Sequence, residues 1–167
     1  SAPEERLGHA AVPSMSLTEN CLITAENRMR LSNKGFIDYT LSRKLSDEII
    51  KKLDVRTGGS EAFARSLSGG NLQKFVIGRE LIQSPKIFIV NQPTWGVDAA
   101  AASSIRQQIL DLAKEGTAVI VISQDLDELL EISDVFCALV GGQLSSPENI
   151  NELNPSRIGM LISNSIQ

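Results

Sequence analysis

The chain has 167 residues, a length typical of one ordinary domain. Hydrophobic residues make up 42% and charged residues 22%, a balance typical of a folded globular protein and not of a disordered one. The formal net charge of -4 leaves no basic excess for contact with phosphate backbones or anionic membrane surfaces. We therefore expect no nucleic-acid partner.

Cysteine, histidine and apolar runs exclude further classes of protein. Cys21 and Cys137 lie among apolar residues and far apart in the chain, so we expect two buried, reduced thiols. His9 is the only histidine, which makes a His/Cys metal cluster hard to build, and we predict no metal ligands. The apolar runs are far too short to span a bilayer, and no export signal is recognisable.

The first half of the chain is predicted to be mostly helical. After a loop over residues 1–13, Ser16 and Glu19 have the spacing of a capping box, which predicts a short helix to about Thr24. A second run, after Asp38, is amphipathic because apolar residues recur every four positions. Those residues are Leu41, Leu45, Ile49 and Leu53. A third helical run is expected over residues 70–83.

The second half alternates apolar runs with helical patterns. Strands are predicted over residues 86–90, 117–123 and 135–140, with helices over 99–114, 126–132 and 155–162. Strands that are apolar throughout and separated by helices indicate parallel β-α-β pairing with both faces covered. Gly141 and Gly142 predict a hairpin turn into residues 143–145. The fold class expected is α/β.

The most informative stretch is LSGGNLQK, at residues 67–74. Ser68, Gly69 and Gly70 precede a helical pattern, where backbone N–H groups, a hydroxyl and the helix dipole together favour an anion. A glycine turn that only caps a helix would also explain SGG taken alone. The motifs that follow along the chain favour the anion site.

Those motifs are NQPT after the strand at 86–90, GVD at residues 96–98, and SQD at residues 123–125. In this order they closely resemble the ATP-binding-cassette (ABC) ATPases, in particular the second cassette of the double-cassette ATPases of sugar and nucleoside importers. PEER at residues 3–6 and MSLTEN at residues 15–20 also resemble that subfamily. The resemblance covers nearly the whole chain.

The resemblance implies a partial cassette in two parts. Residues 1–84 would form the helical signature subdomain with a preceding loop, and residues 85–167 a RecA-like α/β part with a C-terminal hairpin and helix. The phosphate-binding pattern GxxxxGK[ST] does not occur in the chain. We therefore expect truncation upstream and a P-loop-NTPase-like parallel sheet that lacks its N-terminal strands.

Three positions depart from the family's catalytic pattern. Where the family has Asp and Glu before Pro-Thr, this chain has Asn91 and Gln92, and the usual switch histidine is Gln124. An amide accepts no proton at neutral pH, so no catalytic residue is intact and hydrolysis at this site should be very poor. A slow but working site is the weaker interpretation.

In the family, two cassettes pair head to tail and each ATP lies between the P-loop of one and the signature helix of the other. The resemblance thus implies an ATP shared with a partner cassette, with Mg²⁺ at the partner's site. The nucleotide-binding residues implied here are Ser68, Gly69, Gly70, Asn71, Gln73 and Asp98. One site would be hydrolytic and the other structural or regulatory.

The implied partners are an N-terminal cassette of the same polypeptide or a second ATPase subunit, and a transmembrane permease. The location implied is cytoplasmic, at the inner face of the plasma membrane, with an active full-length ATPase and an inactive isolated chain. Two alternatives stay open: a soluble ABC protein acting on ribosomes or DNA, and a purely structural nucleotide-interface module. A sheet with about three parallel strands would also expose an apolar edge and favour self-association.

Overall fold

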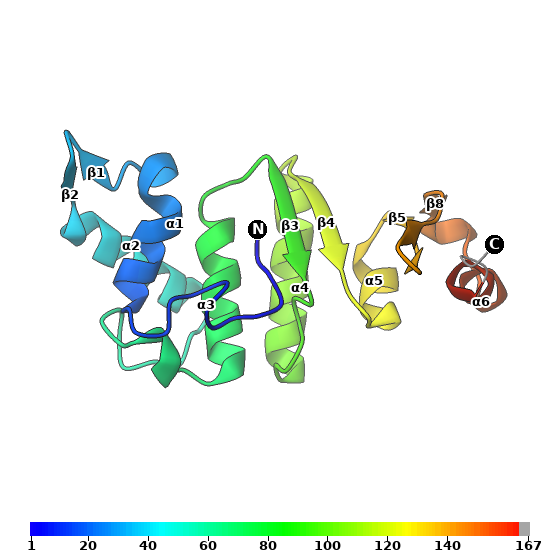
Figure 1. The fold of residues 1–167 in the computed structure, drawn as a ribbon, viewed down its shortest axis with the longest axis horizontal. Helices are drawn as coiled ribbons and strands as arrows, with labels where there is room; N and C mark the ends of the chain where they lie inside the picture. Colours follow the sequence, from blue (N-terminus) through cyan, green and yellow to red (C-terminus); the bar gives the residue numbers. More distant parts are fainter. Residues whose placement is uncertain (164–167) are drawn as a thin grey trace. The chain divides into compact units, whose positions relative to one another are not determined.

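The structure is a computed structural model that describes residues 1–163, and most of its helices and strands are labelled in Figure 1. The chain divides into one compact unit of residues 1–122 and a second unit that begins at Ser123. The change from helical to α/β structure that the sequence predicts at residue 85 falls inside the first unit.

Three helices pack together in the first unit (Figure 1): α1 (Leu17–Met29), α2 (Tyr39–Lys52) and α3 (Gly69–Leu81). The predicted capping box is confirmed, because Glu19 N donates to Ser16 Oγ at 3.1 Å and Ser16 N donates to Glu19 Oε2 at 2.7 Å. Helix α1 continues past the predicted end at Thr24. It ends only where Arg30 takes the left-handed conformation, with φ 54°.

Asp38 is the N-cap of helix α2, and its carboxylate accepts from Leu41 N at 2.9 Å. Of the predicted apolar stripe, Leu45, Ile49 and Leu53 are buried, whereas Leu41 is exposed in the first turn. The stripe therefore forms core along most of its length, as its four-residue spacing predicts.

A short hairpin between α1 and α2 was not predicted. Strand β1 (Ser32–Asn33) pairs antiparallel with β2 (Phe36–Ile37) through a turn in which Lys34 and Gly35 both have positive φ, 50° and 84°. Two left-handed residues are typical of a tight hairpin turn. Strands of two residues have no recognisable period, so sequence patterns give no signal for them.

The parallel β-α-β unit is confirmed. Strand β3 (Ile87–Asn91) pairs parallel with β4 (Ala118–Ile122), and α4 (Ala99–Lys114) connects them (Figure 1). Phe88 and Val90 are buried, but Ile87 on the opposite face is 64% exposed. The expectation that both faces are covered is wrong within the unit of residues 1–122, since Ile89, Ile120 and Ile122 on the second face are exposed as well.

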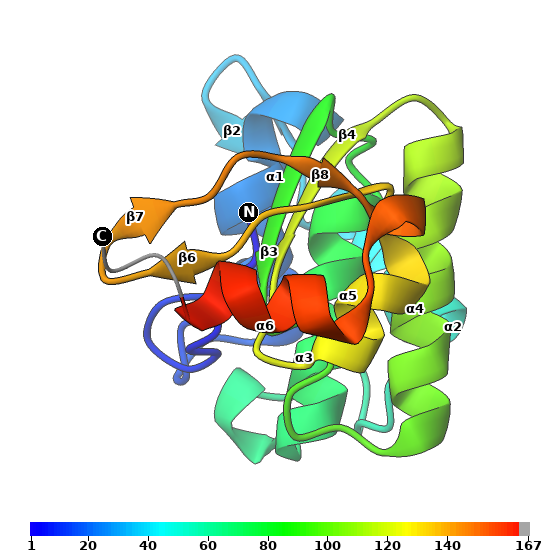
Figure 2. The same ribbon diagram turned by 90° about the vertical axis from the view of Figure 1, so that its right-hand side faces the viewer.

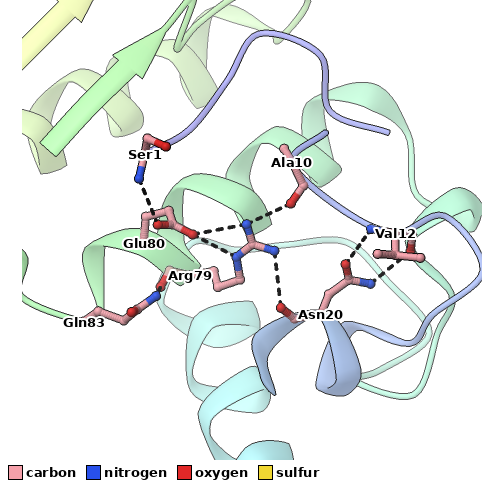
Figure 3. Close-up of polar contacts among 7 residues, drawn as sticks. All are labelled: Ser1, Ala10, Val12, Asn20, Arg79, Glu80 and Gln83. Atoms are coloured by element: carbon pink, nitrogen blue, oxygen red, sulfur yellow. Dashed lines mark hydrogen bonds and ion pairs between the residues drawn. The ribbon is translucent and has the colours of Figure 1, made fainter. Parts of the chain in front are cut away.

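The N-terminal segment is more ordered than the predicted loop. Ala2 adds a parallel bridge to Val90, with Ala2 N donating to Ile89 O and Asn91 N donating to Ala2 O, both at 2.9 Å. The part of this segment around Ala10 is held by the side chain of Arg79 (Figure 3). Arg79, only 2% exposed, donates to the carbonyls of Ala10 (2.8 Å) and Asn20 (3.3 Å).

The second unit contains α5 (Leu126–Ile132), β5 (Val135–Phe136), β6 (Leu139–Val140), β7 (Gln143–Leu144), β8 (Glu148–Asn149) and α6 (Pro155–Ser163). The hairpin predicted at Gly141 and Gly142 is confirmed, and it joins β6 to β7 near α6 (Figure 2). Two short 3-10 turns complete the elements, η1 (Ala64–Ser66) in the first unit and η2 (Ile150–Glu152) in the second.

The single strand predicted over residues 135–140 is wrong. The run is interrupted at Cys137 and Ala138, where the Ala138 N–H donates to Ser145 Oγ at 3.0 Å. Strand β5 pairs antiparallel with β8, and β6 pairs antiparallel with β7. Within residues 1–163 the expected third parallel strand is therefore absent, because the hairpin supplies local antiparallel partners.

Candidate nucleotide interface at the start of α3

The start of α3 differs from the other helix starts of the first unit. Ser68 occupies the N-cap position, with φ -64° and ψ 155°, but its side chain accepts no backbone hydrogen bond. Helices α1, α2 and α4 begin at Ser16, Asp38 and Asp98, and each of these side chains accepts from a first-turn N–H. First-turn N–H groups have no intrahelical acceptor, so those of α3 remain available to an external anion.

Asn71 sets the orientation of the Ser68 hydroxyl. Asn71 Nδ2 donates to Ser68 Oγ at 2.8 Å, and Asn71 Oδ1 accepts from the backbone N–H of Arg56 at 2.8 Å. Since Ser68 Oγ accepts from Asn71, its own hydrogen points elsewhere and can be donated. Ser68 is exposed. The result is a hydroxyl donor beside unbonded helix N–H groups.

The two glycines lie against other parts of the chain. A methyl group at Gly69 would lie 2.7 Å from Nη1 of Arg6, and one at Gly70 would lie 3.7 Å from Cα of Val97. A contact of 2.7 Å is too close for a carbon atom, so Arg6 occupies the space beside Gly69. The absence of side chains also leaves the backbone N–H groups open to close approach.

Gln73, predicted to bind nucleotide, lies behind this surface. Its side chain is 1% exposed, and Nε2 donates to the carbonyls of Pro93 (3.0 Å) and Gln92 (3.3 Å). Oε1 accepts from Nε of Arg6 at 2.9 Å. Both ends of the amide are therefore bonded to protein, and the geometry gives Gln73 a supporting role in place of a phosphate contact.

Asp98 lies in the loop beside the helix start. Its carboxylate accepts from Ala101 N at 2.9 Å and thereby caps α4. This hydrogen bond is the main reason why the pKa of Asp98 lies below its ordinary value of 3.8. The preceding residues, Gly96 and Val97, pack on Gly70, so the structure brings Asp98 to the same region as Ser68, Gly69 and Asn71.

The three positions expected from the sequence to be catalytic and substituted carry amide side chains, those of Asn91, Gln92 and Gln124. Asn91 ends β3 and is half-buried, whereas Gln92 is buried and left-handed, with φ 51°, and its N–H donates to Ile122 O at 2.7 Å. Gln124 is exposed in the second unit, one residue before Asp125, the N-cap of α5. Neutral amides at these positions can donate and accept hydrogen bonds but cannot take a proton from water.

Arg6 also lies in this region, although the sequence indicates it only as part of the PEER motif and predicts no role for its side chain. Its Nη2 donates to the carbonyl of Trp95, and burial lowers the pKa of its guanidinium. The contact with Gln73 joins residues 67 positions apart. Local patterns such as caps and periods say nothing about contacts at this separation.

Curated proteins similar to the chain are ATP-binding proteins of importers. A nucleoside import ATP-binding protein of Lactococcus lactis is 35% identical over 160 residues, covering 96% of this chain and 32% of that protein. A glucose import ATP-binding protein of Haloferax volcanii is 34% identical over 95% of this chain, and a ribose import ATP-binding protein of Shouchella clausii is 36% identical over 93%. The chain thus spans about one third of the length of these relatives.

Solved structures similar to the chain are ABC proteins at low sequence identity. A dimeric ATP-binding cassette in a post-hydrolysis state with ADP and Pi gives a TM-score of 0.70 at 22% identity, covering 90% of this chain and 63% of that chain. An inward-facing metal-chelate type ABC transporter gives a TM-score of 0.72 at 17% identity, covering 96% of this chain and 61% of that chain.

No protein-family model matches the chain. Among residues 1–163, none of the helices combines the length and the apolar character needed to cross a membrane. The chain has the fold of ABC ATPase cassettes. Nearly its whole length is similar to sugar and nucleoside import ATP-binding proteins, and the match covers about one third of the length of each of those proteins.

Proposed function

We propose that this chain is the signature-bearing part of the ATP-binding subunit of an ABC importer of the sugar or nucleoside type. The start of α3 would complete an ATP site held by a partner cassette. The printed functions of the similar proteins, which are nucleoside, glucose and ribose import, support the importer class. Because the chain matches only about one third of the length of these proteins, the activity of the whole subunit is also a proposal.

The observation that carries the proposal is the uncapped start of α3. Gly69 and Gly70 offer backbone N–H groups, and Asn71 turns the Ser68 hydroxyl into a donor at the same place. Several donors and a helix dipole directed at one point suit the negative charge of a γ-phosphate. Asp98 would approach the same interface from the adjoining loop.

ATP and Mg²⁺ would both be held mainly by the partner cassette. Mg²⁺ would neutralise charge on the phosphates there, and this chain would contribute the hydrogen bonds of Ser68, Gly69 and Gly70. The partner would be an N-terminal cassette of the same polypeptide or a second ATPase subunit. A transmembrane permease would place the assembly at the cytoplasmic face of the membrane.

The second site of such a pair would use Asn91, Gln92 and Gln124 and would be hydrolytically silent. Proton handling contributes a rate factor of about 10² to 10⁴ in enzymes, and the three amides cannot provide it. This asymmetry gives the chain its proposed role, which is to complete a working site elsewhere while its own site serves structure or regulation.

The proposal is tested by Ser68→Arg in a subunit of the relatives' length that contains this chain. A long cationic side chain would block the helix start, and we expect ATP hydrolysis to fall by about 10²- to 10³-fold, the loss typical of removing oriented donors. Ser103→Arg, an exposed serine on α4, is the matched control and should keep full activity. Unchanged hydrolysis in Ser68→Arg would contradict the assignment.

Calorimetry on the isolated chain is a second test. The donors at the start of α3 contact only one end of the nucleotide, so the chain alone should show no micromolar affinity for Mg-ATP. Adding a partner cassette that carries a P-loop should restore binding. Micromolar affinity of the isolated chain would show that the nucleotide site is complete without a partner, against the proposal.

A further inference from the structure

The guanidinium of Arg6 lies between the start of α3 and the loop that follows β3. Its Nη1 occupies the space beside Gly69, 2.7 Å from where a methyl group would be. Its Nη2 lies 3.3 Å from the corresponding position at Gly96 and donates to the carbonyl of Trp95. One side chain thus contacts both segments.

The buried side chain of Gln73 also joins the start of α3 to the loop after β3. Its amide accepts from Arg6 and donates to the carbonyls of Gln92 and Pro93, which turn inward after β3. Together, Arg6 and Gln73 donate to three of the four carbonyls of residues 92–95, those of Gln92, Pro93 and Trp95. The two bonds from Gln73 are buried, and a buried carbonyl that loses its donor costs free energy, so these bonds hold the loop in place.

We propose that Arg6 and Gln73 are positioning residues that fix the start of α3 and residues 92–97 as one rigid surface. This inference rests on the proposed function, because that surface is the one which would meet the partner's nucleotide. It assigns a second reason for glycine at position 69. A side chain there would displace Arg6 and free the loop, in addition to hindering a phosphate.

Hydrogen exchange on the intact 167-residue chain tests the proposal without nucleotide. The N–H groups of Trp95 and Val97 donate to loop carbonyls at 3.2 and 3.3 Å and report on the loop's opening. Gln73→Met keeps volume but removes the hydrogen bonds, and we expect exchange of these amides to accelerate about tenfold. Arg6→Met should have the same effect.

Gln83→Met is the matched control. Gln83 is also a buried glutamine, but its Nε2 donates to Arg79 O at 2.9 Å, away from the loop. Its substitution should leave exchange at Trp95 and Val97 unchanged. Equal acceleration in Gln73→Met, Arg6→Met and Gln83→Met would show general destabilisation of the fold and would overturn the proposal. The absence of any acceleration in Gln73→Met would overturn it as well.

A double-mutant cycle tests the contact with Gly69. Gly69→Ala should accelerate exchange in residues 92–97 when Arg6 is present and add nothing in an Arg6→Ala background, because the displaced group is then gone. Additive effects would overturn the role assigned to Arg6. Trp95 is the only tryptophan, so its fluorescence anisotropy gives an independent reading of loop motion in each variant.

Hydrolysis by the longer subunit separates this inference from the proposed function. If both hold, Gln73→Met lowers kcat for ATP with little change in KM, and Gln83→Met does not. If Ser68→Arg leaves hydrolysis intact while exchange responds as described, the proposed function fails and the positioning role stands. If exchange does not respond, the positioning role fails whatever the hydrolysis data show.

Discussion

The residue that precedes α3 shows how one side-chain contact changes the chemistry of a helix start. At Ser16, Asp38 and Asp98 the side-chain oxygen accepts from its own helix, which closes that helix start to other ligands. At Ser68 the oxygen accepts from Asn71 instead. A serine can serve either purpose, and the asparagine three residues later decides between them.

Cys21 shows the effect of burial on a single titratable group. It is fully buried in α1, and burial raises the pKa of its thiol to about 12 from an ordinary 9.0. Because the thiolate is the reactive form, we expect Cys21 to resist thiol reagents in the folded chain while the half-buried Cys137 reacts. The variant Cys137→Ser leaves Cys21 as the remaining thiol. Rapid reaction of Cys21 with a thiol reagent in this variant while it is still folded would contradict the prediction.

The same shift predicts how stability depends on pH. Between about pH 9 and pH 12 the unfolded thiol releases its proton and the folded thiol keeps it, so alkaline pH favours the unfolded state. The free energy of unfolding should fall by about 1.4 kcal/mol per pH unit more than in Cys21→Ala, a slope measurable by urea unfolding. Parallel slopes for the two proteins would show that Cys21 does not titrate in this range.

At the scale of elements, the packing of α2 against α3 depends on a residue without a side chain. A methyl group at Gly78 would lie 2.8 Å from Cγ2 of Ile49 and 3.0 Å from Cγ of Leu53. These two residues belong to the apolar stripe that the sequence predicts. Gly78 therefore lets the two helices approach closely, at the expense of helix propensity.

Gly78→Ala should lower the free energy of unfolding by about 1–3 kcal/mol through overpacking, even though alanine is the better helix former. Gly159→Ala in α6 is the matched control, because a methyl group there would meet no other element among residues 1–163 within 4 Å. It should raise the free energy of unfolding by about 0.5–1 kcal/mol. Urea unfolding followed by circular dichroism measures both, and stabilisation by Gly78→Ala would contradict the packing account.

At the scale of the molecule, one face of the β3–β4 pair in the unit of residues 1–122 carries exposed isoleucines, Ile87, Ile89, Ile120 and Ile122. Ile89 and Ile120 are register partners on this face, and Ile120 is 52% exposed. Adjacent exposed isoleucines on a sheet favour association with a second apolar surface. We propose that the isolated chain self-associates through this face.

Sedimentation velocity over a range of concentrations tests this proposal. The weight-average sedimentation coefficient should rise with concentration for the unchanged chain, and much less for Ile89→Lys combined with Ile120→Lys. Ile23→Lys on α1 removes an equally exposed isoleucine elsewhere and should still associate. A monomer at high concentration of the unchanged chain would contradict the proposal.

Much of the local structure could be predicted from the sequence, because its signals are local. The capping box at Ser16, the stripe of α2 and the helix start at Ser68 all depend on residues within one or two turns. So does the hairpin at Gly141. The α/β class could be recognised in the same way, whereas the role expected of Ser68, Gly69, Gly70 and Asn71 came from the motifs further along the chain and the family they resemble.

The sequence by itself therefore determined the main helices, the parallel pair of β3 and β4, and the residues at the start of α3. Only the tertiary structure decided that Gln73 faces inward, that Arg6 joins the loop to α3, and that residues 135–140 divide between two antiparallel pairs. Caps and periodicity depend on neighbouring residues. Contacts between distant residues depend on how the whole chain satisfies its buried polar groups, which no local pattern records.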